Sequence, residues 1–379
     1  MHQLQRERTD ELLRSKGIRQ ALFTNYCSVK WLTGFAPAVQ TGPYLFAGGP
    51  ALVWYADGHF TLLVVDAQAP AAADFDAQPN CALVSYQGYS LHDPITPALH
   101  LATAFSTIVD ATGPHGGPLA LEENDTPVSL VRLLDDLCPE CTLEPADGWL
   151  EPLRMVKTAE EIEKLRANFA LTGVGHAAAR SAVAAGMREI DVWNVAHGAM
   201  QAAAGQRVPA GEDVVVGYRE NNIAGWPLDY AIRPGGSLIV DLAPMYRGYW
   251  GDSCGTYYAD TPAAEQANAH RTVLAALDFA AERLRPGVVA REFDAQVRRF
   301  LSDAGYSPQP HHSGHGIGVS VHEAPRLVPN NEQCLQEGMV MMVEPGIYVP
   351  GQIAVRLEDA FLITADGAER LTHHDKSLP

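Results

Sequence analysis

The chain has 379 residues, 47% of them apolar, which is long for one domain and predicts two domains with sizeable cores. Its net charge of −18 argues against nucleic-acid binding, because a phosphate-binding surface needs clustered Lys and Arg. No apolar run approaches the ~18–20 residues of a membrane span, and the polar N-terminus lacks the apolar segment of a signal peptide. We therefore expect a cytoplasmic protein with no membrane partner.

Residues 1–152 show strands alternating with helices, which predicts a small α/β domain. Two apolar runs at 51–55 and 60–65 predict a β-hairpin that turns through residues 56–59. Pro127, early in a helical pattern, indicates the start of a helix. The other expected elements are a polar helix at 4–16 and strands at 21–26, 81–86 and 119–121.

The only cysteine pair with a familiar spacing is Cys138 and Cys141, a C-x-x-C pair. No second such pair and no histidine pair lies near it, which argues against a zinc knuckle. A redox motif would have a helix opening on the pair, whereas the helical pattern here precedes it. We interpret the two thiols as chemically inert.

Residues 153–379 form the second predicted domain, which opens with a capping box made by Thr158 and Glu161. Two later segments, beginning at Gly186 and Gly287, resemble each other and each precedes a helical pattern. Their offset of roughly a hundred residues indicates an internal duplication rather than a short-period repeat protein. The elements expected here are helices at 189–204 and 263–284 and strands at 213–216, 237–241, 251–258, 339–349 and 354–364.

The most informative stretch is residues 311–318, His-His-Ser-Gly-His-Gly-Ile-Gly, followed closely by His322. Its glycines allow the backbone to pass close to another group and to take unusual dihedral angles. Imidazoles beside such a run indicate a binding or catalytic site, although a single histidine is more often an ordinary surface or core residue.

Four carboxylates lie in or at the end of apolar strand patterns. Asp241 is predicted to end one strand and Asp252 to begin the return strand, and Glu344 and Glu358 are predicted mid-strand in a hairpin turning at Pro350-Gly351. Any one of these acids alone would be interpreted as a turn former or a solvated residue. Together they indicate a site, because a buried carboxylate is normally paired or bound to metal.

Four carboxylates with one imidazole, His315, are too acidic for a single ion and suit two divalent cations ~3.5–4 Å apart. Oxygen-rich ligation with one histidine indicates Mn²⁺, Co²⁺ or Zn²⁺, with Mn²⁺ as the leading candidate. A water held between two such ions has its pKa lowered toward ~7 and serves as a hydroxide nucleophile.

These motifs resemble the pita-bread metallopeptidase family, which includes methionine aminopeptidase, aminopeptidase P and Xaa-Pro dipeptidase (prolidase). The resemblance covers about residues 153–370, and it is strongest to Xaa-Pro dipeptidase. Residues 31–35, Trp-Leu-Thr-Gly-Phe, also resemble the creatinase-type N-terminal domain of prolidases. The matching segments are 241–252, 313–318 with 321–323, 338–348 and 355–359. The implied fold is α+β, with a duplicated pseudo-twofold pita-bread domain behind a smaller α/β domain.

The resemblance assigns five metal ligands. It implies that Asp252 and Glu358 bridge two ions, that Asp241 serves one, and that His315 with Glu344 serves the other. Glu344 would also be the general acid/base.

The resemblance further implies that His322 and His311 contact the substrate, with His322 near the developing oxyanion. Arg356 would bind the substrate's carboxylate end or form an ion pair with a neighbouring acid, and the sequence leaves both open. The implied activity is hydrolysis of Xaa-Pro dipeptides or short peptides, by a homodimer.

Three positions depart from the family pattern. The family histidine that lies 17 residues before the first aspartate ligand falls on Ala224 here, with Trp226, Tyr230 and His312 as candidate substitutes. Where the family pattern has a threonine and an arginine shortly after the second aspartate ligand, this chain has Cys254 and Gly255. Where the pattern has an aspartate two residues after the last glutamate ligand, this chain has Ala360. We therefore keep two alternatives.

The first alternative is a family member with another specificity, cleaving a non-Xaa-Pro amide or a proline peptide from the C-terminal side. The second is a non-catalytic binding module, which the retention of all five ligands argues against. Creatine amidinohydrolase has the same fold but lacks this full ligand set, so we do not favour that activity.

Overall fold

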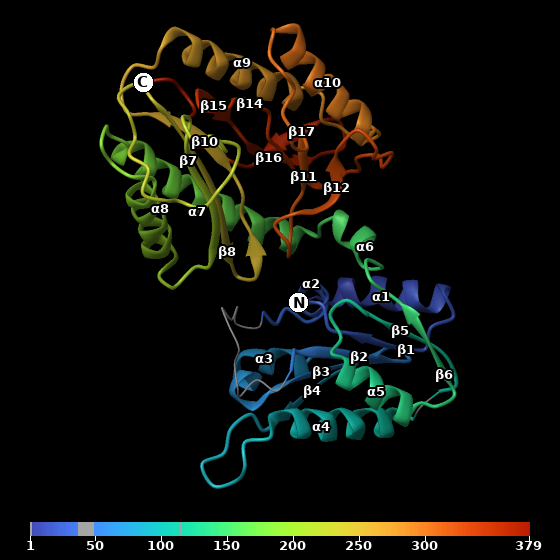
Figure 1. Cartoon of the computed structure of the whole chain (residues 1–379). Coiled ribbons are helices and arrows are strands. Elements are labelled where there is room, and N and C mark those ends of the chain that lie inside the picture. Colours follow the sequence, from blue (N-terminus) through green and yellow to red (C-terminus); the bar gives the residue numbers. More distant parts are fainter. Residues whose placement is uncertain (1, 37–48, 114) are drawn as a thin grey trace. The chain divides into compact units, whose positions relative to one another are not determined.

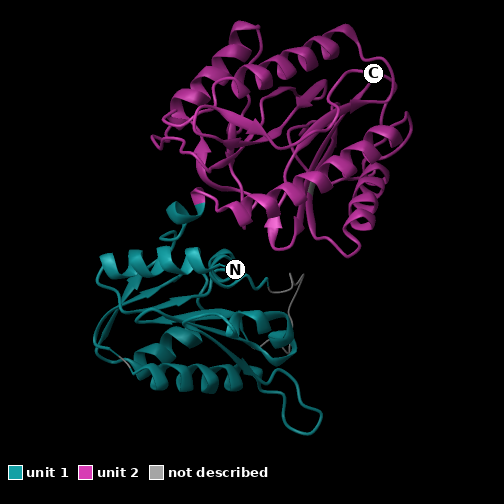
Figure 2. Ribbon diagram, turned by 180° about the vertical axis from the view of Figure 1, so that it is seen from behind, with its two compact units in different colours: residues 1–154 teal, residues 155–379 magenta. Residues whose placement is uncertain are grey.

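The computed structural model describes residues 2–36, 49–113 and 115–379. The chain forms two compact units, residues 1–154 and 155–379, which are coloured separately in Figure 2. The predicted domain boundary after residue 152 lies two residues before this division. Within the described ranges, every helix is too short or too polar to span a lipid bilayer.

The N-terminal unit is built on a six-stranded mixed sheet in the order β4-β3-β2-β1-β5-β6 (Figure 1). The predicted hairpin is confirmed as β2 and β3, paired antiparallel. The strands are β1 Gln20–Phe23, β2 Leu52–Ala56, β3 His59–Val65, β4 Cys81–Tyr86, β5 Gly117–Leu121 and β6 Cys141–Pro145. The helices are α1 Gln3–Ser15, α2 Tyr26–Thr33, α3 Ala69–Asp76, α4 Pro97–Thr112, α5 Val128–Leu137 and α6 Glu151–Met155, with the 3-10 turn η1 Asp66–Gln68.

The predicted strand at 21–26 was too long, because β1 ends at Phe23 and a helix begins at Tyr26. Asn25 caps that helix, α2, by accepting a hydrogen bond from the backbone N–H of Cys27. An Asn at the N-cap satisfies one of the helix's unpaired N–H groups. Cys138 and Cys141 are free thiols.

The C-terminal unit begins with helix α7, and its predicted capping box is confirmed. The Thr158 hydroxyl accepts from the Glu161 N–H at 3.3 Å, and the Glu161 carboxylate accepts from the Thr158 N–H at 2.9 Å. The helix α8 begins and ends where predicted. The four long helices are α7 Ala159–Ala182, α8 Glu189–Ala204, α9 Ala264–Ala281 and α10 Ala290–Asp303.

Two antiparallel sheets and a hairpin lie among these helices (Figure 1). The first sheet has the order β10-β8-β7, with β9 pairing the end of β8, and the second has the order β12-β11-β13-β16-β17. Helices α7 and α8 contact the first sheet, whereas α9 contacts β13, β14 and β15, and α10 contacts β12. The strands are β7 Ala210–Val216, β8 Ser237–Tyr246, β9 Tyr249–Trp250, β10 Cys254–Tyr258, β11 Gly314–Gly316, β12 Glu323–Leu327, β13 Val340–Val343, β14 Gly346–Val349, β15 Ile353–Arg356, β16 Asp359–Ile363 and β17 Ala368–Arg370.

The predicted long strands at 339–349 and 354–364 are wrong, because each is broken in two at its acidic residue. Glu344 lies between β13 and β14, and Glu358 lies between β15 and β16. Pro345 lacks an N–H and cannot continue the ladder. The freed backbone N–H groups bond elsewhere: that of Glu344 donates to Ser313 and that of Glu358 to Cys254. The breaks therefore tie Glu344 to the residue before β11 and Glu358 to the first residue of β10.

The placement of the aspartates also differs from the prediction. Asp241 does not end its strand but lies in the middle of β8, which continues to Tyr246. Asp252 precedes β10 rather than opening it, since that strand starts at Cys254.

The predicted duplication has a structural counterpart in the two halves of the C-terminal unit. Each half begins with a pair of helices and continues into antiparallel strands. The residue before the second helix of each pair forms an isolated antiparallel bridge, Arg188 with Ala231 and Val289 with Cys334. Gly186 and Gly287 precede these bridges with φ of 89° and 84°, a left-handed conformation that favours glycine.

Candidate active site

A pocket of about 330 Å³ in the C-terminal unit brings together most of the predicted site residues. Pockets of this size suit small ligands. The residues that line it are Gly211, Asp213, Ile223, Ala224, Trp226, Asp241, Ala243, Asp252, His311, His312, Val321, His322, Glu344 and Arg356.

His315, Asp252 and Glu358 form a compact buried cluster, of which Asp252 lines the pocket. One nitrogen of the imidazole and one oxygen of each carboxylate lie within 4.8 Å of one another. Nε2 of His315 is 3.6 Å from Asp252 and 3.9 Å from Glu358. Since Nδ1 of His315 lies 2.9 Å from the carbonyl oxygen of Gly316, Nδ1 carries the proton and Nε2 presents its lone pair to the carboxylates.

Glu344 approaches the same ring nitrogen of His315, with Oε1 3.5 Å from Nε2. The same carboxylate oxygen is 2.7 Å from Nε2 of His312, and Oε2 is 3.7 Å from Nδ1 of His311. Burial raises the pKa of the Glu344 carboxyl, but the hydrogen bond to His312 and the neighbouring imidazoles outweigh it and lower the pKa. Glu344 is therefore ionised at neutral pH, as a general base requires.

Asp241 is held by Arg356, whose Nη2 lies 2.7 Å from Oδ2 of Asp241 and 3.0 Å from Oδ2 of Asp213. The two aspartates are directly opposite each other in the register of β7 and β8. Among the described residues, Oδ1 of Asp241 is buried with no hydrogen-bond partner. An unpartnered buried carboxylate oxygen at this place fits the role of a cation ligand.

Unlike Glu344, three acids of the site are destabilised as anions. Burial, together with repulsion from neighbouring carboxylates, raises the pKa of Asp252 and of Glu358 well above the ordinary value. Burial also raises the pKa of Asp241 to about 6, against the opposing effect of Arg356. Burial lowers the pKa of His315 to about 3, so that this ring is neutral and able to ligate. Buried oxygens in excess and a neutral imidazole fit divalent cations.

Arg356 has the ion-pair partners that the sequence left as one of its two roles. Its side chain is buried and its guanidinium also contacts the carbonyl oxygen of Ile223 and, at 3.2 Å, the hydroxyl of Tyr348. These contacts fix the orientation of Asp241. Binding of a substrate carboxylate by Arg356 stays a prediction.

His322 lies at the pocket wall in the loop between β11 and β12. The next residue, Glu323, anchors this loop: its carboxylate accepts from the N–H of Ser320 at 3.2 Å and from buried Lys157 at 3.1 Å. His311 also lines the pocket, with Nε2 2.8 Å from the hydroxyl of Tyr348.

Ala224, which replaces the family histidine, lines the same pocket. Its methyl group supplies no donor or acceptor there. Trp226 lies two residues on and is 83% exposed, so that it borders the pocket from the solvent side.

Sequence matches extend over both units. Residues 163–365 match Metallopeptidase family M24, and residues 5–156 match the Creatinase/Prolidase N-terminal domain. The chain belongs to metallopeptidase family M24. It is 32% identical to the Xaa-Pro dipeptidase of Lactobacillus helveticus over 68% of this chain and 71% of that protein. It is 34% identical to the Xaa-Pro dipeptidase of Pyrococcus furiosus over 61% of this chain and 67% of that protein.

Solved structures of M24 relatives superimpose along nearly the whole chain. The Xaa-Pro dipeptidase from Bacillus anthracis is 25% identical, with a TM-score of 0.83, covering 98% of this chain and 99% of that one. The prolidase from Pyrococcus horikoshii OT3, at 24% identity, has the same TM-score over 99% of both chains. The predicted fold class, an α+β pita-bread domain behind a smaller creatinase-like α/β domain, is confirmed. As an M24 protein the chain is a metallopeptidase, and the family implies divalent metal ions.

Two residues of the site escaped the sequence analysis. Asp213 was noted only as the start of a strand, although it shares Arg356 with Asp241. His312 was considered only as a substitute for the histidine missing at 224, whereas it makes the closest contact to Glu344. The sequence did carry one signal for Asp213, since this charged residue directly precedes the apolar run at 214–216.

Proposed function

We propose that this M24 metallopeptidase hydrolyses Xaa-Pro dipeptides, with two divalent ions, of which Mn²⁺ is the leading candidate. The observation that carries the proposal is the cluster of buried acids around the neutral imidazole of His315 at the base of a small pocket. The names of the relatives from Lactobacillus helveticus and Pyrococcus furiosus, both Xaa-Pro dipeptidases, supply the substrate class.

The five predicted ligands would hold the ions. Asp252 and Glu358 would bridge them, Asp241 would serve one, and His315 with Glu344 would serve the other. When bound, such ions lower the pKa of water and polarise the scissile carbonyl. Arg356 acts on this centre through Asp241: it pairs with Oδ2 and leaves Oδ1 without a hydrogen-bond partner among the described residues.

The remaining steps fall to side chains of the pocket. Glu344, ionised at neutral pH, accepts the proton of the attacking water and delivers it to the imino nitrogen that leaves. His322, at the pocket wall, donates to the oxygen of the former carbonyl as negative charge develops on it. His311 and Arg356 contact the ends of the dipeptide in this proposal.

Ala224 bears on specificity rather than on the centre itself. Because the pocket has no imidazole at this position, contacts that the family histidine makes to substrate must come from other groups or be lost. A shift away from Xaa-Pro peptides is therefore the alternative that an activity assay must separate.

The proposed homodimer comes from the family resemblance, and the proposed cytoplasmic location from the sequence patterns given above. Size-exclusion chromatography with light scattering tests the first, since a dimer has twice the 40.9 kDa of the chain. A single species of 40.9 kDa at micromolar concentration would contradict it.

The experiment for the proposed activity is a peptide panel given to the Mn²⁺-loaded protein. The panel contains Ala-Pro, Ala-Ala, an Ala-Pro-Xaa tripeptide and an N-blocked peptide ending in proline, and product is followed by released amino acid. We expect Ala-Pro to be cleaved and Ala-Ala to be left intact. Cleavage of only Ala-Ala or the blocked peptide would show that the change at 224 has moved the specificity, and would contradict the proposal.

A further inference from the structure

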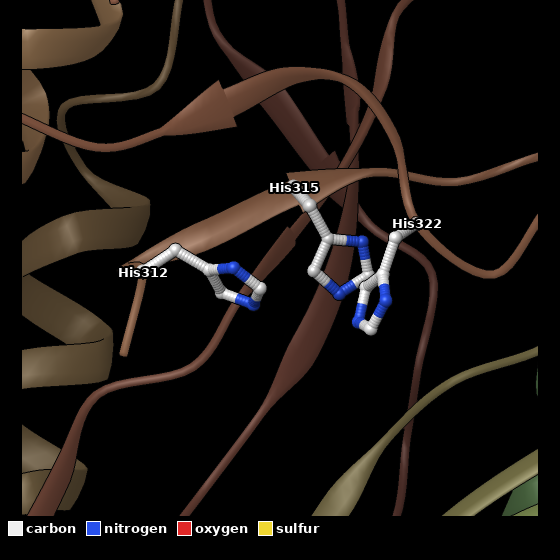
Figure 3. A group of neighbouring side chains, drawn as sticks. All are labelled: His312, His315 and His322. Carbon is white, nitrogen blue, oxygen red and sulfur yellow. The ribbon is translucent and has the colours of Figure 1, made fainter. Parts of the chain in front are cut away.

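Three imidazoles lie close together at the site, those of His312 and His322, which line the pocket, and that of buried His315. One ring nitrogen from each lies within 4.8 Å of the other two (Figure 3). The ring centroids are 5.2 Å apart for His312 and His315 and 4.3 Å apart for His315 and His322. In Figure 3 the rings of all three residues are gathered into one small volume.

A fourth donor lies beside this group of three histidines. Oε1 of Glu344 is 2.7 Å from Nε2 of His312 and 3.5 Å from Nε2 of His315. Three imidazoles and one oxygen donor are a four-coordinate set of the kind that Zn²⁺ takes. Two of these four donors, His312 and His322, are not among the five predicted ligands. This nitrogen-rich donor set therefore differs from the oxygen-rich set that those five ligands form.

The two donor sets share Glu344, whose carboxylate has two oxygens, and His315, which has one free nitrogen. Its Nδ1 is bonded to the carbonyl oxygen of Gly316, which leaves Nε2 as the one nitrogen available for a metal. That nitrogen belongs both to the three-histidine group and to the cluster with Asp252 and Glu358. One lone pair binds one ion, so an ion centred on the three histidines takes this ligand from an ion held by the carboxylates.

The chemistry of the two sets favours different metals. Carboxylate oxygens suit Mn²⁺, whereas imidazole nitrogens suit Zn²⁺ and Cu²⁺, which also bind more tightly in general. We propose that His312, His315 and His322 form a second, nitrogen-rich metal site that binds Zn²⁺ or Cu²⁺ in competition with the carboxylate centre for His315. The inhibition that follows from this competition rests on the proposed function, but the binding itself does not.

Copper is the probe for the donor atoms. One equivalent of Cu²⁺ is added to the metal-free full-length protein, and the nitrogen couplings in its electron paramagnetic resonance spectrum are counted. We expect wild type to show three imidazole nitrogens and His312→Asn to show fewer, while His59→Asn, at an exposed histidine of the N-terminal unit, matches wild type. An unchanged nitrogen count in His312→Asn would overturn the proposal, and His322→Asn provides the same comparison independently.

Zinc titration gives the strength of the site. We expect His312→Asn to weaken Zn²⁺ binding by more than about 10-fold, since losing even an outer-shell partner of a ligand costs about 10–100-fold. In Mn²⁺-loaded protein the same variant should raise the Zn²⁺ concentration needed for inhibition by a similar factor. Equal Zn²⁺ affinity in wild type and His312→Asn would overturn the proposed second site, but it would not contradict the proposed hydrolysis of Ala-Pro. Copper coupling to His312 without any Ala-Pro hydrolysis would support the second site and defeat the proposed function.

Discussion

Replacing Glu344 by glutamine is expected to lower kcat/KM for Ala-Pro by about 10²–10⁴-fold, the usual contribution of a general acid/base group. Glutamine keeps the size of the side chain and can still hydrogen-bond to His312, but it cannot take up the proton of the attacking water. The substitution should also weaken the binding of one metal ion, because Glu344 is one of the proposed ligands.

The control for this variant is Glu337→Gln, at an exposed position of the same unit. Both variants should unfold within a few degrees of wild type when metal-free, so the loss of activity is not a loss of fold. Steady-state assays at saturating Mn²⁺ measure the effect. Wild-type rates in Glu344→Gln would remove Glu344 from the chemistry.

Replacing Asp252 by asparagine is expected to lower Ala-Pro hydrolysis by more than about 100-fold and yet to stabilise the metal-free protein. The activity falls because a proposed bridging ligand is gone, and loss of even outer-shell support costs about 10–100-fold. Asparagine keeps the shape of the side chain and removes the buried negative charge.

The stability change follows from the direction of the pKa shifts. Asp252 and Glu358 have raised folded-state pKa values, as does Asp241 at about 6, so these three carboxyls hold more protons in the folded state than in the unfolded state. Their contribution to stability is therefore full below about pH 4 and is lost as the pH rises through the folded-state values. Metal-free Asp252→Asn lacks the contribution of Asp252, so its stability relative to metal-free wild type should rise as the pH increases from about pH 4.

At pH 7 we expect the free energy of unfolding of metal-free Asp252→Asn to exceed that of metal-free wild type by on the order of 1 kcal/mol. For a domain of this size that difference corresponds to about 2–4 °C in Tm. Added Mn²⁺ should raise the Tm of wild type, since metal binds the deprotonated acids, and should raise that of the variant much less.

Thermal unfolding across pH 4–8, with chelator and with Mn²⁺, measures both effects, and Asp303→Asn at an exposed helix end serves as the control. A metal-free variant less stable than wild type at pH 7 would show that the charge of Asp252 is satisfied by the protein itself.

The sequence predicted the elements whose signals are local. The capping box at Thr158 and Glu161 and the hairpin of the apolar runs at 51–55 and 60–65 required no knowledge of distant residues, and both are confirmed. The breaks at Glu344 and Glu358 did not follow from local pattern, because the backbone N–H groups freed there bond to Ser313 and Cys254 in other parts of the chain. An apolar run alone does not indicate at which residue the hydrogen-bond ladder of the strand is interrupted.

The sequence predicted only those residues of the candidate site that belong to motifs with a recognisable spacing. The glycine-rich stretch around His315 and the paired acids were recognised together, and the structure gathers them around one pocket. The role of Asp213 depends on its register opposite Asp241, and the contact of His312 with Glu344 depends on how a loop turns at β11. Both are three-dimensional relations between residues far apart in sequence.

Anomalous diffraction from a crystal grown with Mn²⁺ tests the dinuclear centre most directly. The proposed function predicts two Mn²⁺ peaks about 3.5–4 Å apart, the separation typical of two-metal sites, with Asp252 and Glu358 contacting both. A single peak, or peaks that leave Asp252 and Glu358 without metal, would contradict it.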